Sequence, residues 1–323
     1  MNIVYSSSNE YTRHAGASID SLLDHSESVA DLNLFVIDYN IDADNKKKLD
    51  SIARKHGRTI NYLPFLEYEG RIFTDGDYKI SKNSYARLFL SEILPESISK
   101  VIWLDCDTIV ADDIADLWNI DLGDKSIAAV QDCGGGYFWR EIGTDHYYRY
   151  FCAGVFVANL KKWRDNSASE KFLAYINFRK GHLEHVDQTV LNAVFHDDCL
   201  MLPPKFDALT PTFVMSYQNL ISYFNFTQQE YYSKAEIKQS IKNPAILHYT
   251  SSNSGRPWER GCKHPKRGLY IQYWKNGPWR DVDYEVFKPG MDSTFRRTYW
   301  MYQHVPVKII NILHSIKKKV IHE

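Results

Sequence analysis

An apolar segment that stops abruptly at a pair of carboxylates constrains the fold of this chain more than any other feature. Residues 101–104 read Val-Ile-Trp-Leu, and Asp105, Cys106 and Asp107 follow directly. Such a run of β-branched and aromatic residues is typical of a central strand that is covered on both faces. Because ligands of open α/β sheets bind at the carboxyl ends of such strands, the pair of carboxylates indicates a ligand site.

The two carboxylates have two interpretations. Where the strand breaks into a turn, both side chains can reach one metal ion, and hard oxygen ligands suit Mg²⁺ or Mn²⁺ with substrate phosphates completing the shell. Alternatively, Asp105 or Asp107 caps the turn that precedes residues 109–110. The other motifs of the chain have to decide between a metal–diphosphate site and a simple turn.

Length and composition exclude several classes of protein. With 323 residues, 44% of them hydrophobic, the chain can bury a large core in one large domain or two small ones. A net charge of -1 creates no global field that would recruit nucleic acid. The five cysteines are scattered without metal-ligand or disulfide spacing, which indicates reduced thiols. The first strand leaves no room for a signal peptide and no apolar run could span a bilayer, so we predict a cytoplasmic protein.

Strands and helices alternate along the chain. The apolar patterns predict strands at residues 3–5, 32–37, 59–63, 101–104, 126–130, 153–160 and 245–247, the last of which delivers His248. They predict helices at residues 12–23, 44–55, 83–94, 114–118, 169–180 and 186–192. The glycines at 134–136 indicate a flexible turn. This order predicts an α/β fold with a mostly parallel central sheet flanked by helices.

The last part of the chain differs in composition. From about Asp292 it is basic and aromatic, and an apolar stripe close to helical spacing runs alongside the lysines at 317–319. We therefore divide the chain into a main domain, residues 1–280, and a helical C-terminal extension, residues 281–323. A basic amphipathic helix can lie on the inner face of a membrane, or its apolar stripe can pack on the main domain, and the sequence leaves both open.

Several motifs stand in a recognisable order between residues 3 and 258. They are Tyr85-Ala86-Arg87-Leu88, Leu104-Asp105-Cys106-Asp107, Ala153-Gly154-Val155, Leu160-Lys161-Lys162-Trp163, Asp187-Gln188, and His248-Tyr249 with Arg256-Pro257-Trp258. In this order the motifs resemble glycosyltransferase family 8, whose retaining enzymes have the GT-A fold and include bacterial lipooligosaccharide galactosyltransferases. The resemblance implies a GT-A catalytic domain that transfers a hexose from a UDP-sugar, with retention, in a Mn²⁺-dependent reaction.

The resemblance also implies roles for single residues. The metal ligands would be Asp105, Asp107 and His248, and the imidazole favours Mn²⁺ over Mg²⁺. Asp187 and Gln188 would be catalytic, with Gln188 stabilising an oxocarbenium-like transition state during front-face attack. Asp132 would contact the acceptor. The donor would contact Ser6, Ser8, Ile80, Arg87, Asp105, Cys106, Cys152, Asp187, Gln188, Gly255 and Arg256.

One departure from the family pattern concerns the donor sugar. Cys152 stands where the family usually has asparagine, so the choice between galactose and glucose stays open, and we favour galactose. The acceptor would be a glycan, either lipid-linked or on a secreted glycoprotein. Two other functions are alternatives: a sugar- or nucleotide-binding protein whose catalytic site has decayed, and a haloacid-dehalogenase-type phosphatase with Asp105 as nucleophile and Asp107 as acid–base.

Overall fold

The computed structural model describes most of the chain. It covers residues 1–26, 29, 31–73, 81–143, 147–227, 229–250, 254–285, 300–301, 304–306, 309–310 and 312–313. Across these residues, no helix combines the length and the apolar character needed to cross a membrane. Ile80 of the predicted donor site and most of the C-terminal extension lie outside the described residues.

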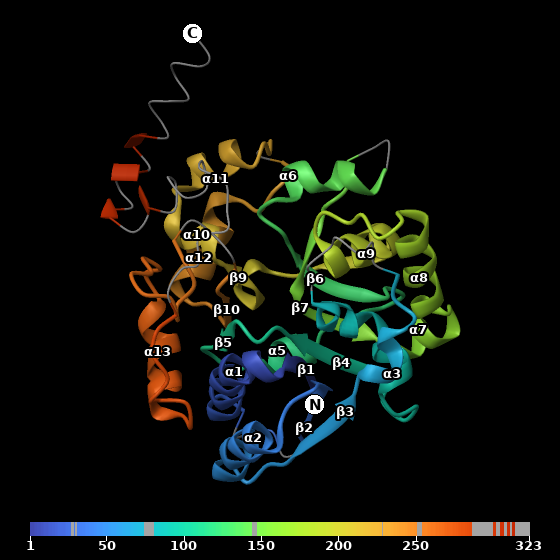
Figure 1. The fold of residues 1–323 in the computed structure, drawn as a ribbon. Coiled ribbons are helices and arrows are strands. Elements are labelled where there is room, and N and C mark those ends of the chain that lie inside the picture. The colour runs from blue at the N-terminus through green and yellow to red at the C-terminus, as the bar shows by residue number, and fades with distance from the viewer. Residues whose placement is uncertain are drawn as a thin grey trace.

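A seven-stranded sheet with the order β3-β2-β1-β4-β7-β6-β8 forms the centre of the molecule (Figure 1). Its strands are β1 (Asn2–Ser8), β2 (Asn33–Tyr39), β3 (Ile60–Pro64), β4 (Lys100–Leu104), β6 (Ile127–Gln131), β7 (Phe151–Asn159) and β8 (Cys199–Met201). Strand β7 runs antiparallel to both of its neighbours, and the other pairs are parallel. The predicted α/β fold with a mostly parallel sheet is therefore confirmed.

The apolar strand β4 lies in the middle of this sheet and is buried on both faces. Ile102 and Leu104 pack into one hydrophobic core, whereas Val101 and Trp103 pack into a second core on the opposite face. This arrangement explains why the segment has no polar alternation, since neither face of the strand meets water. Removing Trp103 and its neighbours from water also makes β4 a rigid support for the carboxylates that follow it.

Two groups of helices supply many of the other side chains in these cores. The first core contains side chains of α1 (Thr12–Asp24), α2 (Ala43–Lys55) and α13 (Arg267–Asn276). The second core contains side chains of α4 (Leu90–Ile93), α7 (Leu160–Asp165), α8 (Ala168–Phe178) and α9 (Val186–Phe195). The remaining α-helices are α3 (Leu66–Glu69), α5 (Ala115–Trp118), α6 (Gly135–Phe138), α10 (Thr210–Val214), α11 (Tyr217–Tyr223) and α12 (Lys234–Lys242). Short 3₁₀ helices occupy Asn9–Tyr11, Lys82–Phe89, Trp139–Ile142 and Pro204–Phe206.

A second, three-stranded sheet adjoins the first and was not predicted. It consists of β5 (Thr108–Val110), β10 (Ile246–His248) and β9 (Ala208–Leu209), with β10 in the middle. The chain passes from β4 of the large sheet to β5 of the small sheet through the turn at residues 105–107. Both carboxylates therefore lie at the junction of the two sheets.

Two predictions about local structure were wrong. The predicted helix 83–94 is mainly the 3₁₀ helix η2 (Lys82–Phe89), followed by the single turn of α4. The predicted flexible turn at 134–136 begins α6, and Gly135 and Gly136 are buried. A Cβ on Gly136 would lie 1.9 Å from the carbonyl oxygen of Phe224, so glycine serves close packing against the end of α11.

The described part of the C-terminal extension contacts the main domain. Glu285 pairs with Arg13 of α1, and its backbone N–H donates to the carbonyl of Trp258. Farther along, Ile310 is fully buried against Val214 of α10. The neighbouring Ile312 is 58% exposed, so the described part of the stripe is only partly covered. The domain boundary near residue 280 stays a prediction.

Candidate functional site

The register of the small sheet brings the predicted metal ligands together. Thr108 of β5 pairs directly with His248 of β10, and the N–H of Tyr249 donates to the carbonyl of Asp107 at 2.9 Å. These contacts hold the imidazole beside the turn, with Nε2 3.2 Å from Oδ1 of Asp107. One ligand atom from each of Asp105, Asp107 and His248 lies within 4.8 Å of the other two.

A pocket of about 310 Å³ opens beside this turn. It is lined by Ser6, Ser8, Tyr11, Ser81, Asn83, Ser84, Arg87, Trp103, Asp105, Cys106, Asp107 and Arg256. The 3₁₀ geometry of η2 explains part of this lining, because three residues per turn place side chains three apart on one face, as Ser84 and Arg87 are. The pocket thus combines several hydroxyl groups with the two guanidinium groups of Arg87 and Arg256.

Arg87 connects the first carboxylate to the predicted catalytic helix. Its Nη2 donates to Oδ1 of Asp105 at 2.7 Å, and its Nε lies 2.9 Å from Oδ2 of Asp187 in an ion pair. The indole N–H of Trp103 also donates to Oδ1 of Asp105 at 2.9 Å. Burial raises the pKa of Asp187 to about 6, although the Arg87 charge acts in the opposite direction. A loss of Arg87 would therefore remove the ion-pair partner of the buried Asp187 carboxylate and leave Asp105 with the indole N–H of Trp103.

Asp107 is held between two cationic groups. Besides His248, the Arg256 guanidinium donates to Oδ2 of Asp107. Burial raises the pKa of this carboxyl, but Arg256 and His248 together outweigh burial and hold the pKa of Asp107 below its usual range. Gly255, with a φ of 78°, adopts the left-handed conformation that turns the chain toward this contact. The sequence predicted Arg256 as a donor-binding residue, and the structure adds its pairing with a predicted metal ligand.

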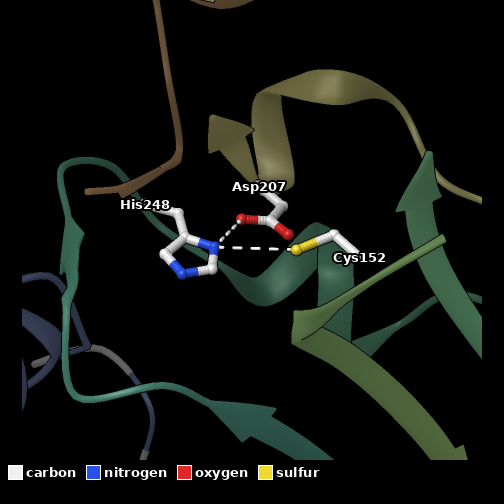
Figure 2. A group of neighbouring side chains, drawn as sticks. All are labelled: Cys152, Asp207 and His248. Atoms are coloured by element: carbon white, nitrogen blue, oxygen red, sulfur yellow. Dashed lines mark hydrogen bonds and ion pairs between the residues drawn. The ribbon is translucent and has the colours of Figure 1, made fainter. Parts of the chain in front are cut away.

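The other ring nitrogen of His248 faces a group that the sequence reasoning missed. Nδ1 lies 2.9 Å from Oδ1 of Asp207 and 3.8 Å from Sγ of Cys152 (Figure 2). Burial lowers the pKa of His248, but Asp107 and Asp207 outweigh burial and raise the pKa well above its usual value. Gly154 follows Cys152 on the same face of β7, and a Cβ there would lie 2.0 Å from Cε1 of His248. The imidazole therefore depends on glycine at this position.

Gln188 is fixed by hydrogen bonds at both atoms of its amide. Its Oε1 accepts from the N–H of Ala153 at 3.0 Å, and its Nε2 donates to Oδ2 of Asp132 at 3.2 Å. One turn later on α9, Asn192 donates to the carbonyl of Gln188 at 2.9 Å and exchanges hydrogen bonds with the backbone of Phe151. Gln188 and Asp132 are thus adjacent, as a catalytic residue and an acceptor contact would have to be.

The remaining predicted donor residues occupy different positions. Ser6 and Cys106 line the pocket, with the Cys106 thiol donating to the Ser6 carbonyl at 3.1 Å and the Ser6 hydroxyl donating to Asn83 at 2.6 Å. Ser8 also lines the pocket. Cys152, by contrast, is not among the pocket-lining residues, and its thiol points toward His248 and Asp207.

A divalent cation fits the side chains at the turn. Two carboxylates and one imidazole form a donor set that Mn²⁺ takes, and the carboxylates also suit Mg²⁺. The raised pKa of His248 means that Nε2 must give up its proton before it can act as a ligand. Asp207 would then hold the Nδ1 proton and orient the ring, as carboxylates behind metal-bound histidines commonly do.

Trp103, Asn192 and Asp207 contact the site residues but were not predicted, although the sequence contains a signal for the first two. Trp103 stands two residues before Asp105, which predicts the same strand face, and Asn192 stands four residues after Gln188, which predicts the same helix face. No local signal identifies Asp207, because it lies 41 residues from His248 and meets it only through the pairing of β9 with β10.

Known proteins are similar to this chain in sequence and in fold. The sequence matches the model of Glycosyl transferase family 8 over residues 2–262. General stress protein A of Bacillus subtilis (strain 168) is 30% identical over 287 residues, which cover 87% of this chain and 96% of that protein. The lipopolysaccharide 1,2-glucosyltransferase of Escherichia coli (strain K12) is 25% identical over 313 residues, covering 94% and 86%. The crystal structure of galactosyltransferase LgtC with donor and acceptor sugar analogs aligns with a TM-score of 0.71 at 22% identity, covering 92% of this chain and 100% of that one.

Proposed function

Because this chain belongs to glycosyl transferase family 8, we propose that it transfers a hexose from a UDP-sugar to a glycan with retention of anomeric configuration. The observation that carries the proposal is the grouping of Asp105, Asp107 and His248 beside a pocket lined by Arg87 and Arg256. Carboxylates that hold a divalent cation, next to two guanidinium groups, match a nucleoside diphosphate in charge and geometry. Because the chain belongs to this family, we no longer consider the alternative that it is a haloacid-dehalogenase-type phosphatase.

The proposed chemistry assigns a task to each group of residues. When bound, the cation, Mn²⁺ or Mg²⁺, would neutralise the charge that develops on the diphosphate as the bond to the sugar breaks. Arg87 would bind the donor, and Asp187 would accept hydrogen bonds from its hydroxyl groups. The acceptor hydroxyl would attack from the face that UDP leaves, while Asp132 positions the acceptor beside Gln188.

The fixed amide of Gln188 supports stabilisation over nucleophilic attack. Its oxygen already accepts from the backbone N–H of Ala153, which withdraws electron density from an atom that is a feeble nucleophile to begin with. The same two hydrogen bonds hold the amide dipole in one orientation before the reaction starts, as electrostatic stabilisation of a transition state requires.

A donor screen tests the proposal. We expect the protein to release UDP from UDP-galactose faster than from UDP-glucose in the presence of Mn²⁺, and EDTA to stop the release. Because a galactosyltransferase and a glucosyltransferase both stand among the similar proteins, the donor preference rests on this assay. Tight binding of UDP with Mn²⁺ but no turnover of any UDP-sugar would instead establish the decayed binding protein.

Replacing Gln188 by alanine should slow transfer on the order of 100-fold, the effect of losing one preorganised stabilising group. No covalent sugar–enzyme adduct should accumulate, which mass spectrometry of the variant during turnover would check. Gln218→Ala, at an exposed position of α11, is the matched control and should keep normal rates. NMR coupling constants of the wild-type product should report an α linkage, and a β linkage would end the retaining assignment.

The acceptor class leads to a prediction for the extension. If the acceptor is lipid-linked, binding to the inner face of a membrane through the basic tail would place the site next to it. Removing the residues from 292 onward should leave UDP-sugar hydrolysis nearly unchanged and reduce sedimentation with anionic vesicles, with neutral vesicles as the control. If the extension instead has a structural role, as the packing of Ile310 on Val214 allows, the truncated protein should unfold and vesicle binding should not decrease.

A further inference from the structure

The side chains of Cys152, Asp207 and His248 are buried and meet at Nδ1 of His248, the ring nitrogen that faces away from Asp107. Cys152 comes from β7, Asp207 immediately precedes β9, and His248 ends β10 (Figure 2). Their exposed fractions are 2%, 1% and 5%, and one ligand atom from each lies within 4.8 Å of the other two. We propose that these residues form a second cation site, selective for Zn²⁺, that shares His248 with the site at Asp105 and Asp107.

An unsatisfied oxygen indicates that the cluster lacks a partner. Oδ2 of Asp207 is buried and accepts no hydrogen bond from any residue that the structure describes, whereas Oδ1 faces His248. A buried carboxylate oxygen without a partner costs free energy, and a cation coordinated by this carboxylate would recover part of that cost. Figure 2 shows the three side chains directed toward one another.

The distances are close to those of a tetrahedral zinc site. With Zn–S of about 2.3 Å and Zn–N and Zn–O of about 2.0–2.1 Å, the tetrahedral angle separates sulfur from nitrogen by about 3.6 Å and nitrogen from oxygen by about 3.3 Å. The observed Sγ–Nδ1 distance is 3.8 Å and the observed Nδ1–Oδ1 distance is 2.9 Å. Only small side-chain adjustments separate the present arrangement from a coordinated one, with one position left for water.

The two sites differ in the types of their ligands and therefore in the cation that each prefers. A thiolate with an imidazole and a carboxylate suits Zn²⁺, while the two carboxylates and imidazole at the turn suit Mn²⁺ or Mg²⁺. Burial raises the pKa of the Cys152 thiol well above its usual value, so without a cation the thiol keeps its proton. Binding of Zn²⁺ would release the thiol proton and the Nδ1 proton of His248 to solvent.

Sharing His248 makes the two sites compete. An imidazole that binds Zn²⁺ through Nδ1 keeps its remaining proton on Nε2, where Asp107 accepts it, and Nε2 then has no lone pair for the other cation. By linkage, Zn²⁺ and Mn²⁺ must weaken each other by the same factor. This consequence rests on the proposed function, but the Zn²⁺ site itself does not.

Cobalt provides a direct test on the full-length protein without any sugar. Co²⁺ should give a near-ultraviolet thiolate-to-cobalt charge-transfer band in the wild type and in Cys199→Ser, a control at another cysteine, but not in Cys152→Ser. Competition by Zn²⁺ should remove the band. The Zn²⁺ affinity of Cys152→Ser should fall on the order of 100-fold or more, because even an outer-shell partner is worth 10–100-fold. Asp207→Asn should keep the band and bind more weakly.

The outcomes separate the parts of the proposal. Equal Zn²⁺ affinity and equal cobalt spectra for the wild type and Cys152→Ser would overturn the site, whatever the activity of the enzyme. Electron paramagnetic resonance of Mn²⁺ tests the sharing: Zn²⁺ should release bound Mn²⁺ from the wild type and from Cys199→Ser at much lower Zn²⁺ concentrations than from Cys152→Ser, where Zn²⁺ competes only directly for Asp105, Asp107 and His248. Binding of both ions together would overturn the competition for His248.

Discussion

Asp107→Asn should reduce kcat/KM for UDP-sugar turnover about 100- to 1,000-fold, a loss of roughly 2.7–4 kcal/mol of transition-state stabilisation. Asp107 is 8% exposed and contacts His248 through Oδ1 and Arg256 through Oδ2. An amide at this position removes a cation ligand and the negative charge that both neighbours face. The measurement is the steady-state rate of UDP release at saturating Mn²⁺, with circular dichroism to confirm the fold.

Asp116→Asn is the matched control for this change. Its carboxylate is 80% exposed and only approaches Lys205 at 3.4 Å, an arrangement worth ~1 kcal/mol or less. The control should therefore keep both activity and stability. A normal rate for Asp107→Asn would show that the carboxylate is only a turn residue, which was the alternative interpretation of the sequence.

Gly154→Ala should displace His248 and disable the site while the rest of the sheet stays intact. The added methyl group would lie 2.0 Å from Cε1 and 2.6 Å from Nδ1 of the imidazole, which has no free space because Asp107 and Asp207 hold it on both sides. Overpacking of this kind costs about 1–3 kcal/mol of stability. We expect Mn²⁺ affinity in the presence of UDP to fall at least about 10-fold, as when the orientation of a ligating histidine is lost.

Gly268→Ala separates this local effect from a general intolerance of alanine. Gly268 lies in α13, and among the described residues nothing outside its chain neighbours and the helix backbone lies within 4 Å of its added Cβ, so alanine there should stabilise the helix by about 0.4–1 kcal/mol. Thermal unfolding and Mn²⁺ binding by electron paramagnetic resonance should be compared for both variants. Unchanged Mn²⁺ binding in Gly154→Ala would mean that His248 is not a ligand of that cation.

The Zn²⁺ and Mn²⁺ experiments constrain each other. If His248 serves the two cations through its two nitrogens, Asp207→Asn should weaken both sites, whereas Cys152→Ser should weaken only the Zn²⁺ site. A change confined to Mn²⁺ in Asp207→Asn would identify Asp207 as an orienting residue alone. The comparison therefore assigns the role of each side chain without reference to sugar transfer.

Local patterns in the sequence were sufficient for the frame of the molecule. The apolar run before Asp105 predicted a strand buried on both faces, because no residue in it could favourably face water, and β4 has that environment. The alternation of periodicities predicted the order of strands and helices in the first half. The motifs predicted the family, since each motif and their order can be read directly from the sequence.

Local patterns failed where long-range contacts decide the conformation. Gly135 and Gly136 looked flexible, but they are packed because α11 and Tyr150 approach their backbone closely. The pattern at residues 245–247 predicted β10, but β5 and β9 are three and two residues long, too short for a periodic signal, and both exist because they pair with β10. Propensity alone could not have indicated the second sheet.

The sequence by itself determined which chemical groups this protein has, and the tertiary structure decided which of them meet. Asp105 and Asp107 are separated by one residue in the chain, so their shared turn was predictable. The contact of His248 with Asp107, Asp207 and Cys152 depends on the pairing of β10 with β5 and β9 and on the absence of a side chain at Gly154, whose place the imidazole occupies. Because strand pairing sets side-chain distances across long stretches of sequence, the spacing of the cysteines gave no sign of the cluster that Cys152 enters.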